Sequence, residues 1–289
     1  MASVQDEIID AVRRLAAAGV EDPWSNAVLF MEALLNREGV EQQLSRRLGT
    51  VESARYRGWI SAREGRMPAQ YILGFQTFRG LRISVTPDVF IPRSYTEALV
   101  RETLARLRNF SDERLLLAEI GSGSGAVSIA IAHAEERVSM IGIELRAEAV
   151  SLAAANAAHN GVEERVTFLV GSGPESLDDQ VKGQLVALIA NPPDLTPEET
   201  VDLVPEAHFE PIGALTAGSR DPLTVHRAIL DAAPGLLRQD GFIAFHVRAT
   251  RASELAEACE KFGFSSETVP SAKPTYPTVV IAGQRSPTS

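Results

Sequence analysis

Apolar positions recur along the chain with two different periods, and the change between them divides the sequence into two parts. From residue 3 to about residue 66 the apolar side chains follow the spacing of amphipathic helices, as at Ile8, Val12 and Leu15. The pattern predicts an N-terminal helix, a second beginning near Pro23, and two more over residues 41–48 and 51–64. About 65 residues make only a small core, so this helical part is expected to dock on the remainder of the chain.

The rest of the chain alternates between short apolar runs and amphipathic segments. A β-hairpin is expected over residues 75–86 with Gly80 in its turn, then an extended connector at 87–92 and a helix over 95–107. The strands predicted beyond it are 115–120, 138–144, 166–170, 185–190, 242–247, 265–270 and 278–283. The helices predicted between them are 125–134, 147–160, 223–237 and 252–262.

Strands that alternate with helices predict an α/β fold with a mostly parallel, doubly wound sheet of seven strands. The last two strands are joined by too short a link for a crossover, so the last strand should be antiparallel. We expect three parts: a small all-helical domain over residues 1–67, a hairpin and connector over 68–94, and the sheet domain over 95–289.

The composition is that of an ordinary globular protein, and it narrows the possible partners. A formal net charge of −10 disfavours general binding to nucleic-acid phosphates. No apolar run approaches the roughly 20 residues of a membrane span, and the N-terminus lacks the features of a signal peptide. The single cysteine, Cys259, excludes an internal disulfide framework, and no metal-ligand spacing is present. A cytoplasmic protein with no membrane partner and no metal is expected.

A glycine-rich loop, EIGSGSG over residues 119–125, comes after the first strand of the sheet domain and opens a helix. Gly121, Gly123 and Gly125 allow a sharp turn and a close approach of ligand to backbone, and the helix N-terminus adds free N–H groups. The spacing also fits a dinucleotide fingerprint, so the loop alone leaves the cofactor open. Glu119 favours S-adenosylmethionine, because a carboxylate there suits a methionine ammonium and would repel a pyrophosphate.

Three further positions complete the predicted cofactor site. Glu144 closes the second strand of the sheet domain, 144 − 125 = 19 residues beyond the last glycine, where an acid can accept both ribose hydroxyls. Ser122 in the loop and Leu145 after Glu144 are expected to contact the same ligand.

The fourth of these strands ends in Asn191-Pro192-Pro193-Asp194. Ligands of open α/β sheets bind beyond the carboxyl ends of the strands, so Asn191 is expected beside the glycine loop. The prolines fix the backbone, and an Asn oxygen with a fixed carbonyl can then accept both hydrogens of a planar NH₂ group. This arrangement orients a nitrogen for attack on a methyl group and has no role in a dehydrogenase.

With these motifs the sequence resembles the HemK-type (PrmC-like) protein-glutamine methyltransferases, which modify translation release factors. The resemblance covers nearly the whole chain. Its further motifs are PAQYILG at 68–74, VTPDVFIPR at 85–93 with Thr96-Glu97 beyond it, and Glu210-Pro211 with Ala214-Leu215.

The resemblance implies a Rossmann-like class I methyltransferase fold. It implies S-adenosyl-L-methionine as cofactor, S-adenosyl-L-homocysteine as product, and a helical domain on the acceptor side. Phe90 and Arg93 are expected to contact the acceptor, and residues 191–194 to carry the catalysis.

The departures from the family gather on the acceptor side. The family motif N-P-P-Y ends in a ring that flanks the planar amide, whereas this chain has Asp194. The family's L-E-I-G is replaced by Phe245-His246-Val247-Arg248, and Ser94-Tyr95 replaces a Pro-acid pair. Residues 271–276 replace its glycine-rich last loop. This pattern favours a small-molecule acceptor in bacterial specialised metabolism. The alternatives are genuine release-factor methylation and a non-catalytic cofactor-binding subunit.

Asp194 adds a charge that the family motif lacks. It can hold a cationic acceptor or remove a proton, either for methyl transfer or for a related cyclisation. His246, near the end of a neighbouring strand, and His208, in the loop after the turn, are further candidates for a base, although a packed or surface histidine is the simpler interpretation of each. The sequence leaves open whether the acceptor atom is N, O or an acidic carbon.

Overall fold

The chain forms two compact units. The computed structural model describes residues 2–36, 39–177, 179–271, 273 and 276–284. One unit contains Met1–Phe75 with Val204–Phe209, and the other contains Gln76–Leu203 with Glu210–Ser289. The helical unit therefore extends beyond residue 67 and takes in a short segment from far along the chain, while most of the predicted hairpin belongs with the sheet.

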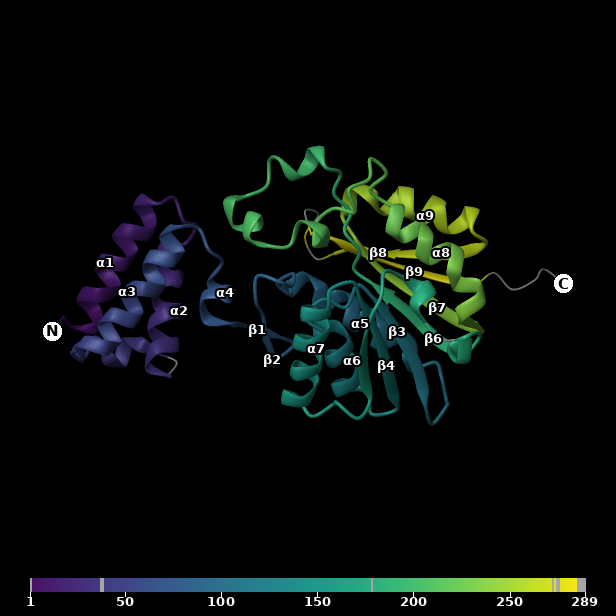
Figure 1. The fold of residues 1–289 in the computed structure, drawn as a ribbon, viewed down its shortest axis with the longest axis horizontal. Coiled ribbons are helices and arrows are strands. Elements are labelled where there is room, and N and C mark those ends of the chain that lie inside the picture. The colour runs from purple at the N-terminus through teal and green to yellow at the C-terminus, as the bar shows by residue number, and fades with distance from the viewer. Residues whose placement is uncertain (1, 37–38, 178, 272, 274–275, 285–289) are drawn as a thin grey trace. The chain divides into compact units, whose positions relative to one another are not determined.

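The helical unit is built from α1 (Val4–Ala17), α2 (Pro23–Leu35), α3 (Thr50–Glu64) and the short α4 (Ala69–Leu73) (Figure 1). Ser3 begins α1 with a capping box that it forms with Asp6. The apolar faces of the helices enclose a core that includes the fully buried Phe30 and Tyr56, and the Tyr56 hydroxyl donates to the backbone carbonyl of Ala27.

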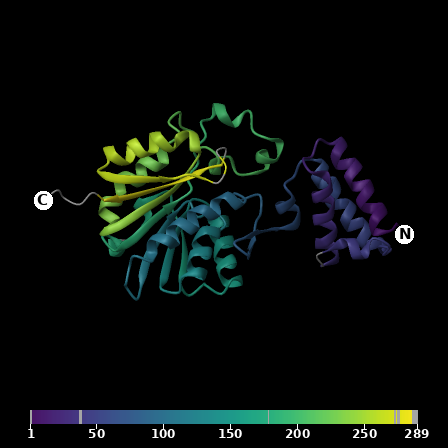
Figure 2. The ribbon, with the colours of Figure 1, turned by 180° about the vertical axis from the view of Figure 1, so that it is seen from behind.

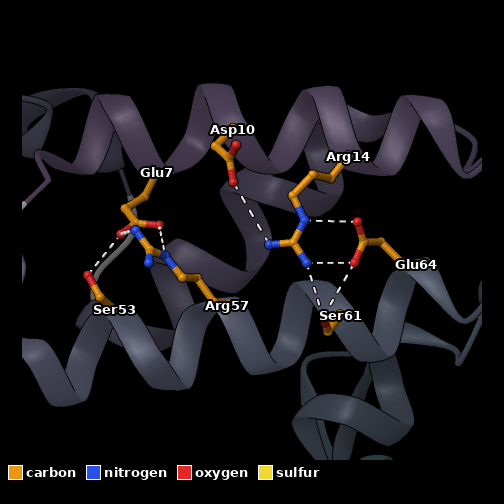
Figure 3. Close-up of polar contacts among 7 residues, drawn as sticks. All are labelled: Glu7, Asp10, Arg14, Ser53, Arg57, Ser61 and Glu64. Carbon is orange, nitrogen blue, oxygen red and sulfur yellow. Dashed lines mark hydrogen bonds and ion pairs between the residues drawn. The ribbon is translucent and has the colours of Figure 1, made fainter.

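Two ion pairs join α1 to α3 (Figure 3). Glu7 is only 2% exposed and accepts from Arg57 at 2.8 and 2.9 Å and from the Ser53 hydroxyl at 2.9 Å. Further along α1, Arg14 donates to both oxygens of Glu64 at 2.8 and 2.6 Å. Because both pairs are bidentate, they fix the register of the two helices as well as adding attraction.

The predicted helix over residues 41–48 is wrong: only the 3₁₀ helix η1 (Val40–Gln43) forms there. The backbone carbonyls of Leu44 and Arg46 accept from the N–H groups of Gln5 and Val4 at the start of α1. These carbonyls satisfy the free N–H groups of another helix, so they are not used to continue their own.

The second unit contains a seven-stranded sheet in the order β5-β4-β3-β6-β7-β9-β8. The strands are β3 (Leu115–Ile120), β4 (Val138–Glu144), β5 (Val166–Val170), β6 (Leu185–Ala190), β7 (Leu237–Val247), β8 (Phe264–Val269) and β9 (Thr278–Gln284). The ladders joining β5, β4, β3, β6 and β7 are parallel, and β9 is antiparallel to both β7 and β8. The predicted fold class is confirmed.

Helices cover both faces of this sheet (Figures 1 and 2). On one face the core includes residues of α5 (Glu97–Leu107), α6 (Ala126–Ala134) and α7 (Ala147–His159). On the other it includes residues of α8 (Thr224–Leu236) and α9 (Ala252–Lys261). In the described part of the chain, no helix is long and apolar enough to cross a membrane.

The predicted hairpin forms as β1 (Phe75–Phe78) and β2 (Leu81–Ser84), and a buried asparagine ties it to the sheet domain. Asn156, on α7, pairs with both the N–H and the carbonyl of Ser84. The same amide donates to the backbone carbonyl of Ser124 in the glycine loop at 2.9 Å. One side chain therefore positions both the hairpin and the loop.

Candidate active site

The candidate site lies where the strand order changes direction. β3 and β6 are neighbours in the sheet but lie far apart along the chain, so the segments that leave their carboxyl ends open a crevice at this switch point. The glycine loop comes after β3 and the Asn-Pro-Pro turn after β6. As predicted from the sequence, Gly121, Gly123 and Asn191 line one cavity.

The glycines of the loop have two different functions. Gly121 and Gly123 have φ values of +75° and +53° and line the cavity, and a Cβ on either would meet no heavy atom within 4 Å. Gly125, in contrast, is absent from the cavity wall as far as the structure describes it, and a Cβ there would lie 2.7 Å from Phe168. The first two glycines therefore leave room for a ligand, and the third allows α6 to pack closely on the sheet.

Glu119 lies in the wall of this cavity and is 2% exposed. Its Oε2 accepts from the backbone N–H of Ser128 at 3.0 Å and from the Ser128 hydroxyl. Burial raises the pKa of Glu119 to about 8, although the bonds from Ser128 oppose the shift. A buried carboxyl of this kind is suited to a cationic group, which would stabilise its ionised form.

Glu144 ends β4 beside the loop. Its carboxylate accepts from the backbone N–H of Gly123 at 2.9 Å and from that of Arg146 at 3.2 Å. Glu144, Ser122 and the exposed Leu145 all line the cavity, as the sequence predicted. The Ser122 hydroxyl is buried and has no hydrogen-bond partner in the described structure, so it is available to a ligand.

The cavity has a volume of about 540 Å³, which is in the range of sites for drug-sized ligands and cofactors. One part of its wall contains Gly121 and Gly123 of the loop, the buried Glu119, and Glu144 at the end of β4. The remaining wall is mostly apolar and includes Phe78, Val89, Phe90, Pro92, Ile212 and Val225. The chemistry of these residues fits S-adenosylmethionine: Glu119 would suit its ammonium, Glu144 would suit its ribose hydroxyls, and the glycines would leave room for it.

A buried ion pair joins two parts of the apolar wall. Arg93 donates to Glu210, whose side chain is 1% exposed, and the other oxygen of Glu210 accepts from the backbone N–H of Ile91 at 3.0 Å. Arg93 also stacks over Phe90, with 5.0 Å between the guanidinium carbon and the ring centre. Phe90 itself lines the cavity, whereas Arg93 is not part of the wall that the structure describes. Arg93 therefore supports the wall, and Glu210, which the sequence marked only as part of a motif, is its partner.

Asn191 contacts a residue of the neighbouring strand. Ala190 pairs with Phe245 in the parallel ladder of β6 and β7, so the next residues, Asn191 and His246, lie side by side. His246 Nδ1 and Asn191 Oδ1 are 2.9 Å apart. The ring of Tyr95 stacks on His246 with 5.7 Å between centres and 23° between planes.

Asp194 is held outside the described cavity wall. Its Oδ2 accepts from the backbone N–H of Arg248 at 2.7 Å, and its Oδ1 lies 3.7 Å from Arg248 Nε. Burial raises the pKa of Asp194, and the bond and charge of Arg248 oppose that shift. Glu199 extends the network, since it pairs with Arg248 at 2.6 Å and with Arg251 at 3.0 Å.

The remaining candidates lie elsewhere. His208 belongs to the segment that packs with the helical unit. Of the final loop, residues 272, 274 and 275 lie outside the described residues, while Tyr276 contacts the Tyr95 ring at 5.6 Å.

Three supporting residues, Ser128, Asn156 and Glu210, were not predicted as site residues. A polar residue inside a helix or loop gives no recognisable sequence signal until its partner is known.

Fold and cavity together define a class I methyltransferase that uses S-adenosylmethionine. Residues 94–188 match the precorrin methyltransferase domain family. The crystal structure of a methyltransferase from Pyrococcus furiosus superposes with a TM-score of 0.51, covering 71% of this chain and 89% of that one at 17% identity. At that identity, the similarity supports the fold.

Sequence comparisons show the family to which the chain belongs. Residues 8–74 match the PrmC N-terminal domain family. The chain is 34% identical to the release factor glutamine methyltransferase of Geobacter sulfurreducens over 86% of both chains. It is 33% identical to that of Moorella thermoacetica over 88% of both. The chain belongs to the HemK family of release factor glutamine methyltransferases and is an S-adenosylmethionine-dependent methyltransferase, which confirms the resemblance.

Proposed function

We propose that this methyltransferase acts on a small-molecule acceptor held against the Asn191-Pro192-Pro193 turn. The observation that carries the proposal is the position of the departures from the family motifs. Tyr95, Asp194, His246 and Arg248 come from three separate segments of the chain, yet each contacts Asn191, contacts its partner His246, or holds the turn that contains it. Tyr276, from the remaining replaced segment, contacts Tyr95. Changes that gather at one point of a site are expected when the acceptor has changed, while the cofactor side keeps its glycine loop and both acids.

The cofactor supplies an electrophilic methyl group on a sulfonium centre, and the residues of the chain supply alignment. Asn191 can accept a hydrogen from the acceptor, and the two prolines keep the turn rigid, so the nucleophile is held at one distance and angle. The apolar wall around Phe90 and Ile212 favours a neutral, largely apolar acceptor and excludes water from it.

In this proposal Asp194 supports the turn. A general base must come within hydrogen-bond reach of the proton that it removes. The Asp194 carboxylate is already bonded to the backbone of Arg248 and lies outside the described cavity wall. We therefore assign contact with the acceptor to Asn191, Pro192 and Pro193, and a holding role to Asp194.

Methylation of a release-factor glutamine is the second candidate. It is favoured by the relatives named release factor glutamine methyltransferase, which align with 86–88% of the chain, and by the match of the helical unit to the PrmC N-terminal domain family. In this candidate the Asn191 oxygen and the backbone of the turn accept the two hydrogens of the glutamine amide, and Asp194 takes the place of the flanking ring.

The two candidate functions can be distinguished by identifying which molecule receives the methyl group. The purified enzyme is incubated with methyl-labelled S-adenosylmethionine and either the release factor with its Gly-Gly-Gln motif or the low-molecular-weight cell extract. We expect label in a small molecule and none in the release factor, under conditions where the Geobacter relative labels its own release factor fully. Efficient labelling of the glutamine, lost when it is replaced by alanine, would refute the small-molecule proposal.

A further inference from the structure

We propose that His246 is a positioning residue that fixes the orientation of the Asn191 side-chain amide. The contact between His246 Nδ1 and Asn191 Oδ1, at 2.9 Å, is the described side-chain hydrogen bond of Asn191. Without it the amide could rotate about its last side-chain bond or exchange its oxygen and nitrogen positions. The inference rests on the proposed function in one respect, which is that Asn191 contacts the acceptor.

The His246 ring is well placed for this task because it is itself immobile. It is 1% exposed, lies on β7 between β6 and β9, and is covered on one face by the Tyr95 ring. The Tyr95 ring in turn makes a tilted contact with the Tyr276 ring, so rings from three segments of the chain pack together. A ring packed in this way holds its hydrogen bond at nearly constant geometry.

A neutral His246 ring is compatible with its hydrogen bond to Asn191. Burial lowers its pKa to about 4, although the Tyr95 backbone opposes the shift. The ring is therefore neutral near pH 7, with a hydrogen on one nitrogen and a lone pair on the other. Because an amide oxygen can only accept, the proposed bond requires the hydrogen on Nδ1, and Oδ1 then keeps a second lone pair for the acceptor.

The same geometry argues against His246 as the general base. Its Nδ1 is engaged with Asn191, and its Nε2 is buried. His246 does not belong to the described cavity wall, so an acceptor proton would not reach the lone pair on Nε2. The residue acts through Asn191.

Two substitutions separate the hydrogen bond from the packing. His246→Phe keeps a ring beneath Tyr95 and removes the bond, whereas His246→Asn places an amide nitrogen near the position of Nδ1 and can restore it. We expect His246→Phe to lower kcat roughly 100-fold, the effect of a misplaced reacting group, with little change in KM or in the Kd for S-adenosylmethionine. His246→Asn should recover most of the lost kcat.

His226→Asn is the matched control. His226 is also fully buried, with a pKa that burial lowers to about 4 and that its contact with the His246 backbone opposes. It packs against Phe245 at 5.2 Å, but no bond joins it to Asn191 among the described residues, so it tests the loss of a buried imidazole beside His246 without loss of the Asn191 bond. Its substitution should lower thermal stability without changing kcat. Equal kcat values for wild type and His246→Phe, or failure of His246→Asn to exceed His246→Phe, would overturn the proposal.

A second readout needs no acceptor, so it tests the inference even if the proposed function fails. In ¹⁵N imidazole spectra at pH 7, the His246 signals, assigned by their loss in His246→Asn, should report a neutral ring with hydrogen on Nδ1. Asn191→Leu should shift these signals and leave those of His226 in place. A charged ring, or hydrogen on Nε2 in the wild type, would contradict the assigned bond.

Discussion

Glu119 and Ser128 are joined by two hydrogen bonds, one from the backbone N–H at 3.0 Å and one from the hydroxyl, and both end on the same carboxylate oxygen. Ser128 lies on α6, so the helix that begins after the glycine loop also holds the acid that precedes it. The other oxygen has no hydrogen-bond partner among the described residues, and Glu119 lies in the cavity wall. A buried carboxyl that is held in one orientation and has one oxygen without a hydrogen-bond partner is well placed to bind a cationic group.

This arrangement makes cofactor binding depend on pH. In the ligand-free protein the pKa of Glu119 is about 8, so the carboxyl is mostly protonated at pH 7. Binding of a cationic ammonium favours the ionised form and releases a proton, so the affinity should rise up to tenfold per pH unit between pH 6 and about 7.5. It should pass through a maximum near pH 8 and fall beyond it, as the ammonium loses its own proton. Calorimetry in buffers of different ionisation enthalpy measures both the affinity and the proton. Glu119→Gln should bind more weakly and with no such slope, and a wild-type affinity that is flat over this range would contradict the role.

The same carboxyl should reduce the stability of the ligand-free protein at high pH. Its pKa is higher in the folded than in the unfolded chain, where it is near 4.5, so stability falls as the pH rises from 4.5 to 8. Glu119→Gln keeps an oxygen for Ser128 and has no charge. The Tm of Glu119→Gln should therefore exceed that of wild type by an amount that grows between pH 5 and pH 8.5. A difference that stays constant with pH would show that the wild-type carboxyl does not titrate in this window.

Gly123 tests the shape of the cofactor cavity. Its φ of +53° is unfavourable for other residues, and a side chain there would extend into open space within the cavity. Gly123→Val should abolish binding of S-adenosylmethionine, measured by calorimetry. Gly161→Val, at a φ of +69° after α7, is the control, because it carries a similar backbone penalty away from the cavity. It should lower Tm and leave the Kd unchanged, and cofactor binding by a folded Gly123→Val protein would refute this view of the loop.

The sequence was sufficient to predict the sheet and the meeting of the predicted cofactor residues at one cavity, because both depend on local signals. Alternating apolar strands and helices predict a mostly parallel sheet, and the glycine loop and the Asn-Pro-Pro turn each lie at the end of a strand. The helix expected over 41–48 failed because its carbonyls bond to the start of α1, a non-local competition that no local pattern reveals.

The acceptor side was predicted less well for the same reason. Asp194 and His246 were considered as separate candidates for a base, since nothing in their spacing indicates that one binds the backbone of Arg248 and the other binds Asn191. The role of a polar side chain at a strand end depends on the adjacent strand, and strand order is a tertiary property. The departures from the family motifs lie close together in the structure, but the sequence did not reveal which contact each residue makes.

Glu206 shows how the helical unit holds a segment from the sheet half of the chain. It lies in Val204–Phe209 and pairs with Arg66 at 2.7 Å and with the buried Arg63 at 2.9 Å. Burial would raise the pKa of Glu206, but the bonds from Arg66 and Arg63 outweigh it and lower the pKa to about 2. The folded pKa lies below the unfolded value of 4.5, so the stabilisation is present above pH 4.5 and is lost as the pH falls toward 2.

Glu206→Gln should therefore destabilise the protein at pH 7 by an amount on the order of 2 kcal/mol. The effect should be clearly smaller near pH 3 and should disappear only toward pH 2, where the folded carboxylate also takes up its proton. Urea unfolding at both pH values measures this. Glu198→Gln, on the same loop and with no described ion pair, serves as control and should be nearly silent. Equal destabilisation by Glu206→Gln at pH 7 and pH 3 would mean that its charge is not the source of the effect.

Substitutions of Asp194 can distinguish a carboxylate that supports the turn from one that acts as a general base. Its Oδ2 accepts the Arg248 N–H at 2.7 Å, and an asparagine can present an oxygen at the same place without the charge. Asp194→Asn should therefore keep kcat within a few-fold of wild type, whereas Asp194→Ala, which leaves the Arg248 N–H without its acceptor, should lose more and should also lower Tm by removing a partly buried bond.

A general base would behave in the opposite way. Its loss in Asp194→Asn would reduce kcat by roughly 100-fold or more and would remove the acidic limb of the pH–rate profile, with the Kd for S-adenosylmethionine unchanged. Asp194→Tyr, which restores the ring of the family motif, completes the set. If it gains activity on the Gly-Gly-Gln release factor while losing activity on the small-molecule acceptor, then this position contributes to acceptor choice. If Asp194→Asn alone abolishes turnover with an intact fold, the supporting role assigned to Asp194 is incorrect.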